Sequence, residues 1–485
     1  MSGKAKPLYK DVADRIAAQI ANGTIRVGGR IPSIRSTSRK LSVSITTVIE
    51  AYRVLEDRGL VESHPQSGFF VRDPAFARRH AEFAPPEPEA RHLSMKPTRV
   101  RVWSRFSQTL DAIHRDDVPP LGLANPSPDL LPVEQVNRIL ARLVRNEPGL
   151  STQYELSPGC LALRTAIARR AFDAGCTLGP DDIVITTGTT EALMLALHAV
   201  ASPGDTVAVE SPCYVGILHL LQRLQLDAVE LPTDPRDGVS MQAIEEIAGP
   251  SKNEVSAVIL NPTVHNPLGG IMSDEKKRRV AAVLQRARIP LIEDDIYGDL
   301  ALADHRPRCL KASDKSGNVI LCSSVRKTIA PGYRIGWIAA GKRSSEVNEF
   351  KLAFSLGSTT ATQLAIAEYL EGRRFDRHLA RMRRRYAEQL QLLADAVGRY
   401  FPDGTKATSP MGGHVLWVEL PSTIDTFKLY EEALEKNVSF APGAIFSPTG
   451  RYQNCMRLNA GFAWSERIES AIQTLGRLAK RRVRK

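Results

Sequence analysis

Cysteine is scarce in this chain of 485 residues, which contains only six widely spaced cysteines. They form no C-x-x-C pair and stand beside no histidine cluster, so neither a disulfide framework nor a metal site is indicated. No stretch of about 18 apolar residues that could span a bilayer is present, and the opening MSGKAKPLYKD lacks the apolar core of a signal peptide. We therefore expect a cytoplasmic protein that is neither secreted nor embedded in a membrane.

Hydrophobic residues make up 43% of the chain and charged residues 24%, which is the composition of a globular protein with enough apolar material for a core. The length predicts two or three domains. A formal net charge of +12 favours an acidic partner, although a basic balance alone can also be no more than a solvated surface. The distribution of charge along the chain must decide between these two interpretations.

The sequence divides into three parts, residues 1–72, 73–117 and 118–485. After Asp73, proline, alanine and charges of both signs replace hydrophobic periodicity, as expected of a linker, which could reach about 150 Å if fully extended. From about Leu121 onward, short apolar runs such as DDIVITT, SAVILN and IPLIED alternate with helical patterns such as TEALMLALHAV. This alternation predicts an α/β body with a mostly parallel sheet buried on both faces.

The first part has the pattern of a winged helix-turn-helix. Apolar residues recur every four positions from Leu8 to Ile20, which predicts a first helix. A second short helix is expected over residues 34–41, and Ser44 can cap a third helix after a tight turn, which is the helix-turn-helix spacing. The runs GLVE and GFFV, separated by HPQS, predict a β-hairpin wing.

The segment GGRIPSIRSTSRKLSVSITTVIEAYRVLEDRGLVESHPQSGFFV resembles the GntR-type winged-helix family at nearly every motif position. Residues 1–72 hold twelve bases and six acids, so about half of the excess charge lies in roughly a seventh of the chain. The alternative is a helical appendage whose basic face is only solvated. The resemblance implies binding of double-stranded operator DNA. The residues expected to contact DNA are Arg30, Arg35, Arg39, Lys40, Ser44, Thr46, Thr47, Gln66, Ser67 and Gly68.

One position departs from the family pattern. The family usually has an arginine directly after the serine that begins the recognition helix, whereas this chain has Ile45. Ile45 cannot form a hydrogen bond to a guanine edge, so the resemblance leaves open which bases are read. Binding to DNA phosphates does not depend on this position.

In the third part, ITTGTTEALMLAL runs from an expected strand into a helix across residues 187–190. Free backbone N–H groups at a helix N-terminus favour an anion, although such a turn can also be only a cap. The motifs ESPCYVG, NPTVHNPLGG, IEDDIYGD, SSVRKTIAPGYRIGW and MRLNAGF come next, in this order. Together they resemble the class I aminotransferases of fold type I over about residues 121–480, whose large sheet domain is followed by a smaller C-terminal α+β lobe.

The whole chain resembles the MocR (GabR-like) regulators, in which such a body is fused behind a GntR-type winged helix. The resemblance implies pyridoxal 5'-phosphate as cofactor, with Lys327 as the Schiff-base lysine. Asp294, rather than Asp295, is then the carboxylate that keeps the ring nitrogen protonated. Asn266 and Tyr297 match the residues that form hydrogen bonds to the ring oxygen.

The remaining site residues are also implied by the resemblance. Tyr214 matches an aromatic that stacks on the cofactor ring, although it can instead be a core residue. Arg457 matches the arginine that binds a substrate carboxylate. Tyr154 matches a tyrosine that reaches the phosphate of a neighbouring subunit, which presumes a homodimer, head-to-tail by resemblance. The phosphate-binding set is completed by Gly188, Thr189, Thr190, Ser324 and Arg334.

A second departure is Arg326, directly before Lys327, where a serine that contacts the phosphate is common. Arg326 could add charge near the phosphate or lower the pKa of the lysine, and it puts ordinary turnover in doubt.

Two functions from different classes remain open. In the first, an amino acid or related amine displaces Lys327 to form an external aldimine, and the altered body shifts the winged helices between DNA-competent and incompetent arrangements. In the second, the body is an active aminotransferase and the head only localises or autoregulates it. The fused DNA reader favours regulation.

Two basic runs lie outside these motifs. The C-terminal run from Arg477 to Lys485 could add non-specific DNA affinity, although charged tails are usually only solvated. The arginine-rich RRFDRHLARMRRRY around residue 380 is interpreted as one face of a long helix, part of which could line a surface along which DNA passes.

Overall fold

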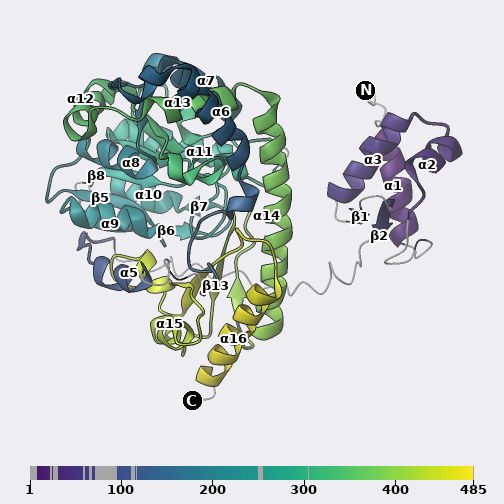
Figure 1. The fold of residues 1–485 in the computed structure, drawn as a ribbon. Helices are drawn as coiled ribbons and strands as arrows, with labels where there is room; N and C mark the ends of the chain where they lie inside the picture. Colours follow the sequence, from purple (N-terminus) through teal and green to yellow (C-terminus); the bar gives the residue numbers. More distant parts are fainter. Residues whose placement is uncertain are drawn as a thin grey trace, which may run out of the picture. The chain divides into compact units, whose positions relative to one another are not determined.

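A computed structural model of the chain describes residues 8–21, 25, 31–57, 60–64, 68–71, 95–110, 115, 117–249, 255–303 and 305–483. The chain forms two compact units, a head (Met1–Glu82) and a body (Phe83–Lys485). Figure 1 shows the elements of both.

The head contains the expected helices and hairpin. They are α1 (Leu8–Ala21), α2 (Ile34–Leu41), α3 (Ile45–Asp57) and the antiparallel strands β1 (Val61–His64) and β2 (Gly68–Val71). Helix α2 ends at Ser42, whose backbone is left-handed with φ of 51°. Ser44 then accepts a hydrogen bond of 3.0 Å from the Thr47 amide, which caps α3 as the sequence predicted.

The core of the head joins all of these elements. Buried side chains of α1, α3 and both strands pack into one apolar cluster around Val48 and Leu55. The Tyr52 hydroxyl lies 2.6 Å from the Thr37 hydroxyl and donates to the Pro32 carbonyl, so it ties α3 to the start of α2. Leu8 was expected in the apolar stripe of α1 but is 57% exposed, because the stripe reaches the core only from Val12 onward.

The body contains a nine-stranded sheet, ordered β3-β6-β5-β8-β9-β10-β11-β4, with β7 paired to β6. Strands β6, β5, β8, β9 and β10 run parallel, whereas β3, β7, β11 and β4 join antiparallel to their neighbours. The strand bounds are β3 (Thr98–Arg99), β4 (Val184–Thr186), β5 (Thr206–Ser211), β6 (Asp227–Asp234), β7 (Gly238–Val239), β8 (Val255–Leu260), β9 (Leu291–Asp294), β10 (Val319–Ser324) and β11 (Gly336–Ala339).

The sheet is buried on both faces, as its continuous apolar runs predicted. On β5, Val207 and Val209 face a cluster that includes α8 (Thr189–His198) and α9 (Val215–Arg223). Ala208 faces the opposite cluster, to which α10 (Met241–Ala248) and α11 (Asp274–Ala287) contribute. Because successive side chains of a strand point to opposite faces, each layer of helices buries every second residue.

Residues 95–110 belong to the body, although the sequence placed them in the linker of residues 73–117. Strand β3 pairs with β6, and Val100 and Val102 are buried against the helices of the sheet. In α5 (Trp103–Leu110), Trp103 stacks on His219 with ring centroids 4.7 Å apart. The described part of the body therefore reaches back to Met95, and residues 73–94, 111–114 and 116 of the expected linker lie outside the described ranges.

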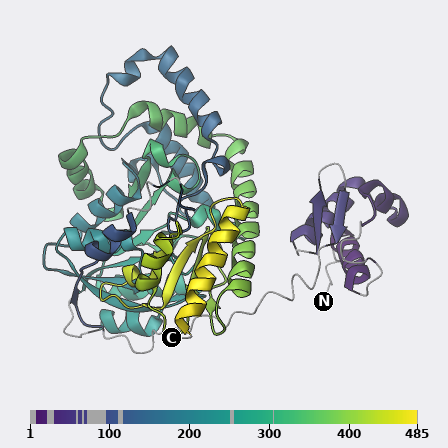
Figure 2. The ribbon, with the colours of Figure 1, turned by 60° about the horizontal axis from the view of Figure 1, so that its bottom comes forward.

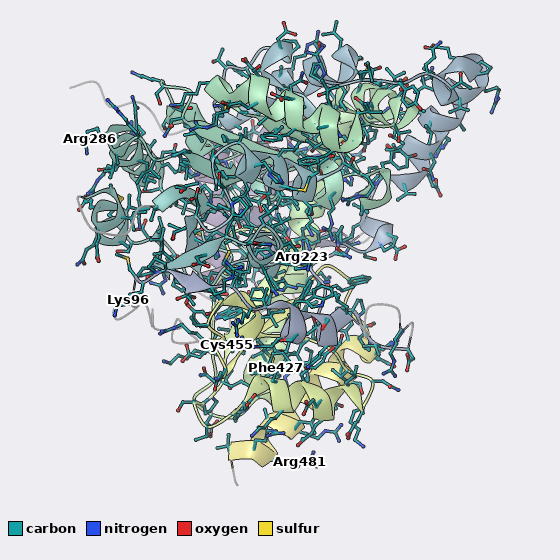
Figure 3. All side chains as sticks on the ribbon, turned by 90° about the vertical axis from the view of Figure 1, so that its left-hand side faces the viewer. Lys96, Arg223, Arg286, Phe427, Cys455 and Arg481 are labelled. Carbon is teal, nitrogen blue, oxygen red and sulfur yellow. The ribbon has the colours of Figure 1, made fainter. Side chains whose placement is uncertain are left out.

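A smaller antiparallel sheet forms the C-terminal lobe, in the order β12-β13-β15-β14. Figure 2 shows the last helix, α16 (Glu466–Val483), beside the long helix α14 (Arg373–Tyr400). Figure 3 shows Arg481 at the outer end of this lobe. The other lobe elements are β12 (Lys406–Ala407), β13 (Val415–Glu419), α15 (Thr426–Leu434), β14 (Ala441–Pro442) and β15 (Cys455–Asn459).

The basic C-terminal run is partly paired within the lobe. Arg482 lies 2.8 Å and Arg481 3.6 Å from the carboxylate of Glu432 on α15. These two charges are therefore engaged by the protein's own surface.

Four further helices pack near β4, the edge strand of the large sheet. They are α6 (Val133–Asn146), α7 (Leu161–Ala171), α12 (Ser344–Ser355) and α13 (Thr360–Leu370). Helix α13 packs on α6, α7 and α14. None of the described helices is both long enough and apolar enough to cross a membrane, and the described residues contain no cluster of three or more metal-ligating side chains. All six cysteines are buried, free thiols.

Candidate functional site

The site lies where the parallel strands of the large sheet end. Asp294 is the last residue of β9 and Ser324 the last of β10, and Lys327 closes the single helical turn that comes after β10. Asn261 comes directly after β8. Because the carboxyl ends of parallel strands meet at one edge of a sheet, residues far apart in the sequence are brought together here.

Lys327 is 4% exposed. Its ammonium group donates a hydrogen bond to the Ala124 carbonyl and lies 5.4 Å from the centroid of the Tyr297 ring. Burial lowers the pKa of Lys327 well below its ordinary value, and the positive charges of Arg326 and Arg457 lower it further. A buried lysine of this kind loses its proton readily and becomes a nucleophile.

The two adjacent aspartates have different surroundings. The Asp295 carboxylate forms a 2.5 Å ion pair with Arg306, so its charge is already compensated. Oδ1 of both carboxyls is buried without a hydrogen-bond partner, but among the described residues Asp294 forms no ion pair. Burial, and then repulsion from Asp295, raise the pKa of Asp294 to about 7, which leaves this carboxyl available for a cationic partner.

A concave turn leads into α8. Gly188 has a φ of 84°, and a β-carbon there would lie 2.9 Å from Nη2 of Arg334. That guanidinium donates a 2.8 Å bond to the Thr187 carbonyl, while the Thr189 hydroxyl donates a 2.8 Å bond to that of Ser324. The turn therefore gathers a helix N-terminus, hydroxyls and a cation, which together suit a phosphate group. Thr190, in the same turn, is exposed.

Arg457, on β15, is a buried cation held by uncharged groups. Its Nη1 donates to Oδ1 of Asn266 at 3.2 Å and its Nη2 to the Gly122 carbonyl at 2.9 Å. Among the described residues no carboxylate pairs with it, and burial lowers its pKa. Since burying an unpaired charge is costly, the surroundings favour an anion that binds beside it.

Two tyrosines border the same space. Tyr297 is 1% exposed, and its hydroxyl has no hydrogen-bond partner. Tyr214 lies at the start of α9 and is partly buried against the apolar clusters of both lobes. A β-carbon at Gly216 would overlap the Tyr214 ring, so this glycine leaves room for the ring beside the helix.

His414 was not predicted as a site residue from the sequence. Its ring centroid lies 5.6 Å from that of Tyr297 and 4.9 Å from that of Tyr386. It is completely buried, and neither ring nitrogen has a hydrogen-bond partner. Burial and the nearby charge of Lys327 lower the pKa of His414 to about 3. The preceding Met411-Gly412-Gly413 marks a turn, but nothing in it indicates that the next residue, a histidine, faces this space.

The orphaned polar atoms of this pocket agree with the cofactor that the motifs imply. Asp294, Tyr297, Arg457 and His414 each present a buried polar atom without a partner, and buried polar groups are normally satisfied. A ligand with a basic ring nitrogen, a hydroxyl and a phosphate would satisfy such atoms and fill the turn at Gly188. The residues present therefore fit pyridoxal phosphate.

Tyr154 and Arg326 were also singled out in the sequence. Tyr154 is 84% exposed, so it is not enclosed in the pocket of its own chain, and its role across a dimer stays a prediction. Arg326 donates a 2.9 Å hydrogen bond to Asn125. Its guanidinium therefore contacts the residue that comes directly after Ala124, whose carbonyl accepts from Lys327. Its charge lowers the pKa of Lys327, which is one of the two effects expected from the sequence.

In the head, the basic residues of α2 are available to a partner. Arg35, Arg39 and Lys40 are exposed and form no ion pair among the described residues. The Ser44 hydroxyl bonds to those of both Thr46 and Thr47, so these side chains are partly engaged in capping α3. Ile45 is 51% exposed beside them. Arg30, Gln66 and Ser67 lie outside the described residues, and Gly68 begins β2.

Known proteins resemble both units. The family model "Bacterial regulatory proteins, gntR family" matches residues 8–71, and "Aminotransferase class I and II" matches residues 121–475. The HTH-type transcriptional regulator YjiR of Escherichia coli is 37% identical and covers 96% of this chain and 98% of its own. Aromatic-amino-acid aminotransferase 1 of Thermococcus litoralis is 30% identical over 81% of this chain and 94% of its own.

A solved structure shares the fold of the body. It is the α-aminoadipate aminotransferase LysN from Thermus thermophilus, complexed with N-(5'-phosphopyridoxyl)-L-leucine. The TM-score is 0.71 and the identity 26%, over 79% of this chain and 99% of that one.

Proposed function

The chain belongs to the class I and II aminotransferase family and carries a GntR-family head, and we propose that it regulates transcription by sensing a small amine with pyridoxal phosphate. It is an HTH-type transcriptional regulator with an aminotransferase-like body, the architecture of the MocR regulators. The head implies DNA binding and the body implies a small-molecule ligand. The cofactor, the class of ligand and their coupling to DNA binding are proposed.

The observation that carries the proposal is the buried Lys327 beside an uncompensated Asp294. Bound pyridoxal phosphate supplies an aldehyde that condenses with primary amines. Lys327, with its lowered pKa, would hold that aldehyde and yield it to a competing amine. Asp294 would receive the ring nitrogen, while the turn at Gly188 and Arg334 would hold the phosphate.

Arg457 indicates the class of ligand. Its guanidinium is fixed by Asn266 and Gly122, both uncharged acceptors, so its positive charge remains to be matched. A carboxylate is the anion that suits a planar guanidinium in two-point contact. The ligand proposed is therefore an amino acid, whose amine competes with Lys327 while its carboxylate binds Arg457. The leucine adduct of LysN combines the same two groups in one ligand.

Regulation requires that the two states of the protein bind the ligand differently. The head offers exposed cations on α2 for DNA phosphates, and a homodimer would present two such heads to paired half-sites. Occupation of the body then changes the affinity of the heads for DNA.

An active aminotransferase is the alternative function. It is favoured by the completeness of the pocket, since the nucleophile, the ring partner, the phosphate turn and the carboxylate site are all present. The presence of a DNA-binding head favours regulation, because catalysis alone has no use for one.

One experiment separates the two functions. Amino acids, polyamines and amino sulfonates are titrated into the full-length holoprotein, with the absorbance of the bound cofactor and the binding of promoter DNA monitored together. A spectral change coupled to DNA affinity, without sustained turnover, supports the sensor. Steady formation of a keto acid with unchanged DNA affinity supports the enzyme and contradicts the proposal.

The role of Lys327 has its own test. We expect Lys327→Ala to lose the absorption band of covalently bound pyridoxal phosphate, because no other amine occupies that position in the pocket. The matched control is Lys315→Ala, at an exposed lysine, which should keep the band. An unchanged spectrum of Lys327→Ala would place the covalent bond on another residue.

A further inference from the structure

A basic pocket lies at the start of the long helix α14, away from the site described above. It has a volume of about 450 Å³, and its lining residues come from α6, α13 and α14. Figure 1 labels these three helices. None of the residues that line it belongs to the proposed cofactor site. Four arginines, one tyrosine and one histidine contribute most of its polar lining: Arg138, Arg374, Arg377, Arg381, Tyr369 and His378.

The arginines of α14 carry charge that the protein does not compensate. Arg374, Arg377 and Arg381 are spaced three and four residues apart, which places them on one face of the helix. All three are exposed, and among the described residues none of them forms an ion pair. Like charges at this spacing repel one another, so the arrangement costs stability unless an anion binds between them.

A buried hydroxyl provides an independent indication of a ligand. Tyr369, on α13, is 3% exposed, and its hydroxyl is buried without a hydrogen-bond partner. Burial raises its pKa, so the hydroxyl keeps its proton and can act as a donor. An acceptor oxygen entering the pocket would satisfy it and would meet the arginines as well.

The end of the helix reinforces the charge. Helix α14 begins at Arg373, and its N-cap residue, Gly372, has no side chain that could accept a hydrogen bond from the first-turn amides. The only acid of its first turn, Asp376, is paired at 2.5 Å with Arg170 on α7. The positive end of the helix dipole therefore adds to the arginines.

His378 connects this pocket to Lys327. Its Nε2 lies 2.6 Å from the Thr328 carbonyl, directly after Lys327 in the sequence. Because a carbonyl only accepts, Nε2 carries the proton in this contact, and Nδ1 is left to accept from Arg381 at 3.3 Å. Burial lowers the pKa of His378 to about 4, which agrees with this neutral form. A movement of Arg381 toward an anion would remove the donor from Nδ1.

We propose that this pocket binds a small multivalent anion of the phosphate-ester class, and that its occupation is communicated to the Lys327 segment through Arg381 and His378. The anion site is independent of the proposed function, whereas its coupling to Lys327 rests on it. A phosphate of a DNA duplex has the same charge, but it lies on a convex backbone. It would meet the arginines at the rim without reaching the buried hydroxyl of Tyr369.

Inorganic phosphate is the probe for the anion site. It is titrated calorimetrically, at constant ionic strength, into the full-length holoprotein after unbound pyridoxal phosphate, itself a phosphate ester, has been removed. We expect the double variant Arg374→Gln/Arg377→Gln to bind phosphate at least about tenfold more weakly than the wild type, because two charge-assisted contacts are lost. The matched control Arg384→Gln/Arg385→Gln removes equal charge from the same helix outside the pocket and should bind like the wild type.

Each other result has a defined meaning. Any phosphate that binds at the head or at the Gly188 turn binds equally to all the variants, so it does not affect the comparison. If Arg374→Gln/Arg377→Gln binds phosphate with the same affinity as the wild type, the anion site is overturned. If that equality is accompanied by a loss of affinity for duplex DNA, the pocket serves the DNA backbone instead. Weaker phosphate binding by Tyr369→Phe, with unchanged thermal stability, would support the role of the buried hydroxyl.

The coupling is measured separately by hydrogen exchange of the backbone amides around Thr328. Phosphate should alter their exchange in the wild type and leave it unchanged in Arg374→Gln/Arg377→Gln. No response in a wild type that binds phosphate would overturn the coupling. A chain that binds phosphate in the pocket but forms no covalent bond with pyridoxal phosphate would disprove the proposed function and leave the anion site in place.

Discussion

Asp294 and Asp295 show how far the surroundings of a residue determine what it can do. Both are buried at the end of β9, yet among the described residues only Asp295 forms an ion pair, with Arg306. Oδ1 of both carboxyls is buried without a hydrogen-bond partner. It is therefore the lack of an ion pair at Asp294 that supports the motif's choice of this residue for the ring nitrogen. Because of this difference, we expect the substitutions Asp294→Asn and Asp295→Asn to have different effects on stability and on cofactor binding.

We expect Asp295→Asn to lower the free energy of unfolding of the body by about 3 kcal/mol, because it leaves the buried Arg306 without one of its charge partners. Asp294→Asn should not lower the stability of the cofactor-free protein, since it removes a carboxyl whose charge is disfavoured by burial. It should instead weaken the binding of pyridoxal phosphate. Chemical unfolding and an absorbance titration of both variants measure the two effects, and reversed results would mean that the roles are exchanged.

His414 makes the stability of the body depend on pH. Burial lowers its pKa to about 3, from an ordinary value of 6.5. Between these values the unfolded chain binds more protons than the folded one, so stability is lost as the pH falls below about 6.5. From pH 7 to pH 5 the wild type should lose about 2 kcal/mol more than His414→Gln. Urea unfolding at both pH values checks this, and parallel losses in the two proteins would contradict it.

At this scale the motifs brought Lys327 and Arg457 to attention, and the roles assigned to them stay predictions. The motifs could not predict His414 or Tyr369, because the role of each depends on burial by segments distant in the sequence. Nothing local distinguishes a histidine after two glycines, or a tyrosine near the end of a helix, from an ordinary core residue.

Among the elements, those of the head were the most predictable. Apolar spacing and the capping serines determined α2 and α3 almost to the residue, since both signals are local. Strand β3 was missed for the opposite reason. It has two residues, Thr98 and Arg99, and exists only because it pairs with β6 more than a hundred residues later, whereas the local composition is that of a linker.

The exposed start of α3 leads to a prediction about DNA recognition. Ile45 lies on the surface where the family carries an arginine, and α2 of the same unit presents the exposed cation Arg35. We expect Arg35→Ala to reduce affinity for a bound promoter fragment about tenfold, because a charged phosphate contact is lost. Ile45→Ala should reduce it less. Fluorescence anisotropy with the full chain measures both, and the reverse order would show that Ile45 makes the more important contact.

For the molecule as a whole, charge is concentrated where the fold predicts a nucleic-acid partner. Twelve bases and six acids occur in residues 1–72, and the three cations of α2 are unpaired among the described residues. The affinity for DNA should therefore fall steeply with salt, by about a thousandfold between 50 and 200 mM if about six phosphates are contacted. Binding that is insensitive to salt would exclude a phosphate-led interface.

The pairing of β3 with β6 limits how widely the two heads of a dimer can be spread. Only about 26 residues separate the wing at Val71 from the anchored strand at Thr98, and even when taut they cover no more than about 90 Å, compared with about 150 Å for the full stretch first assigned to the linker. Half-sites one helical turn apart, about 34 Å, remain within range. If the half-sites are moved apart by whole helical turns, both heads of one dimer should still bind them at short separations. Binding of both heads should be lost sharply once the separation exceeds the reach of the two connecting segments.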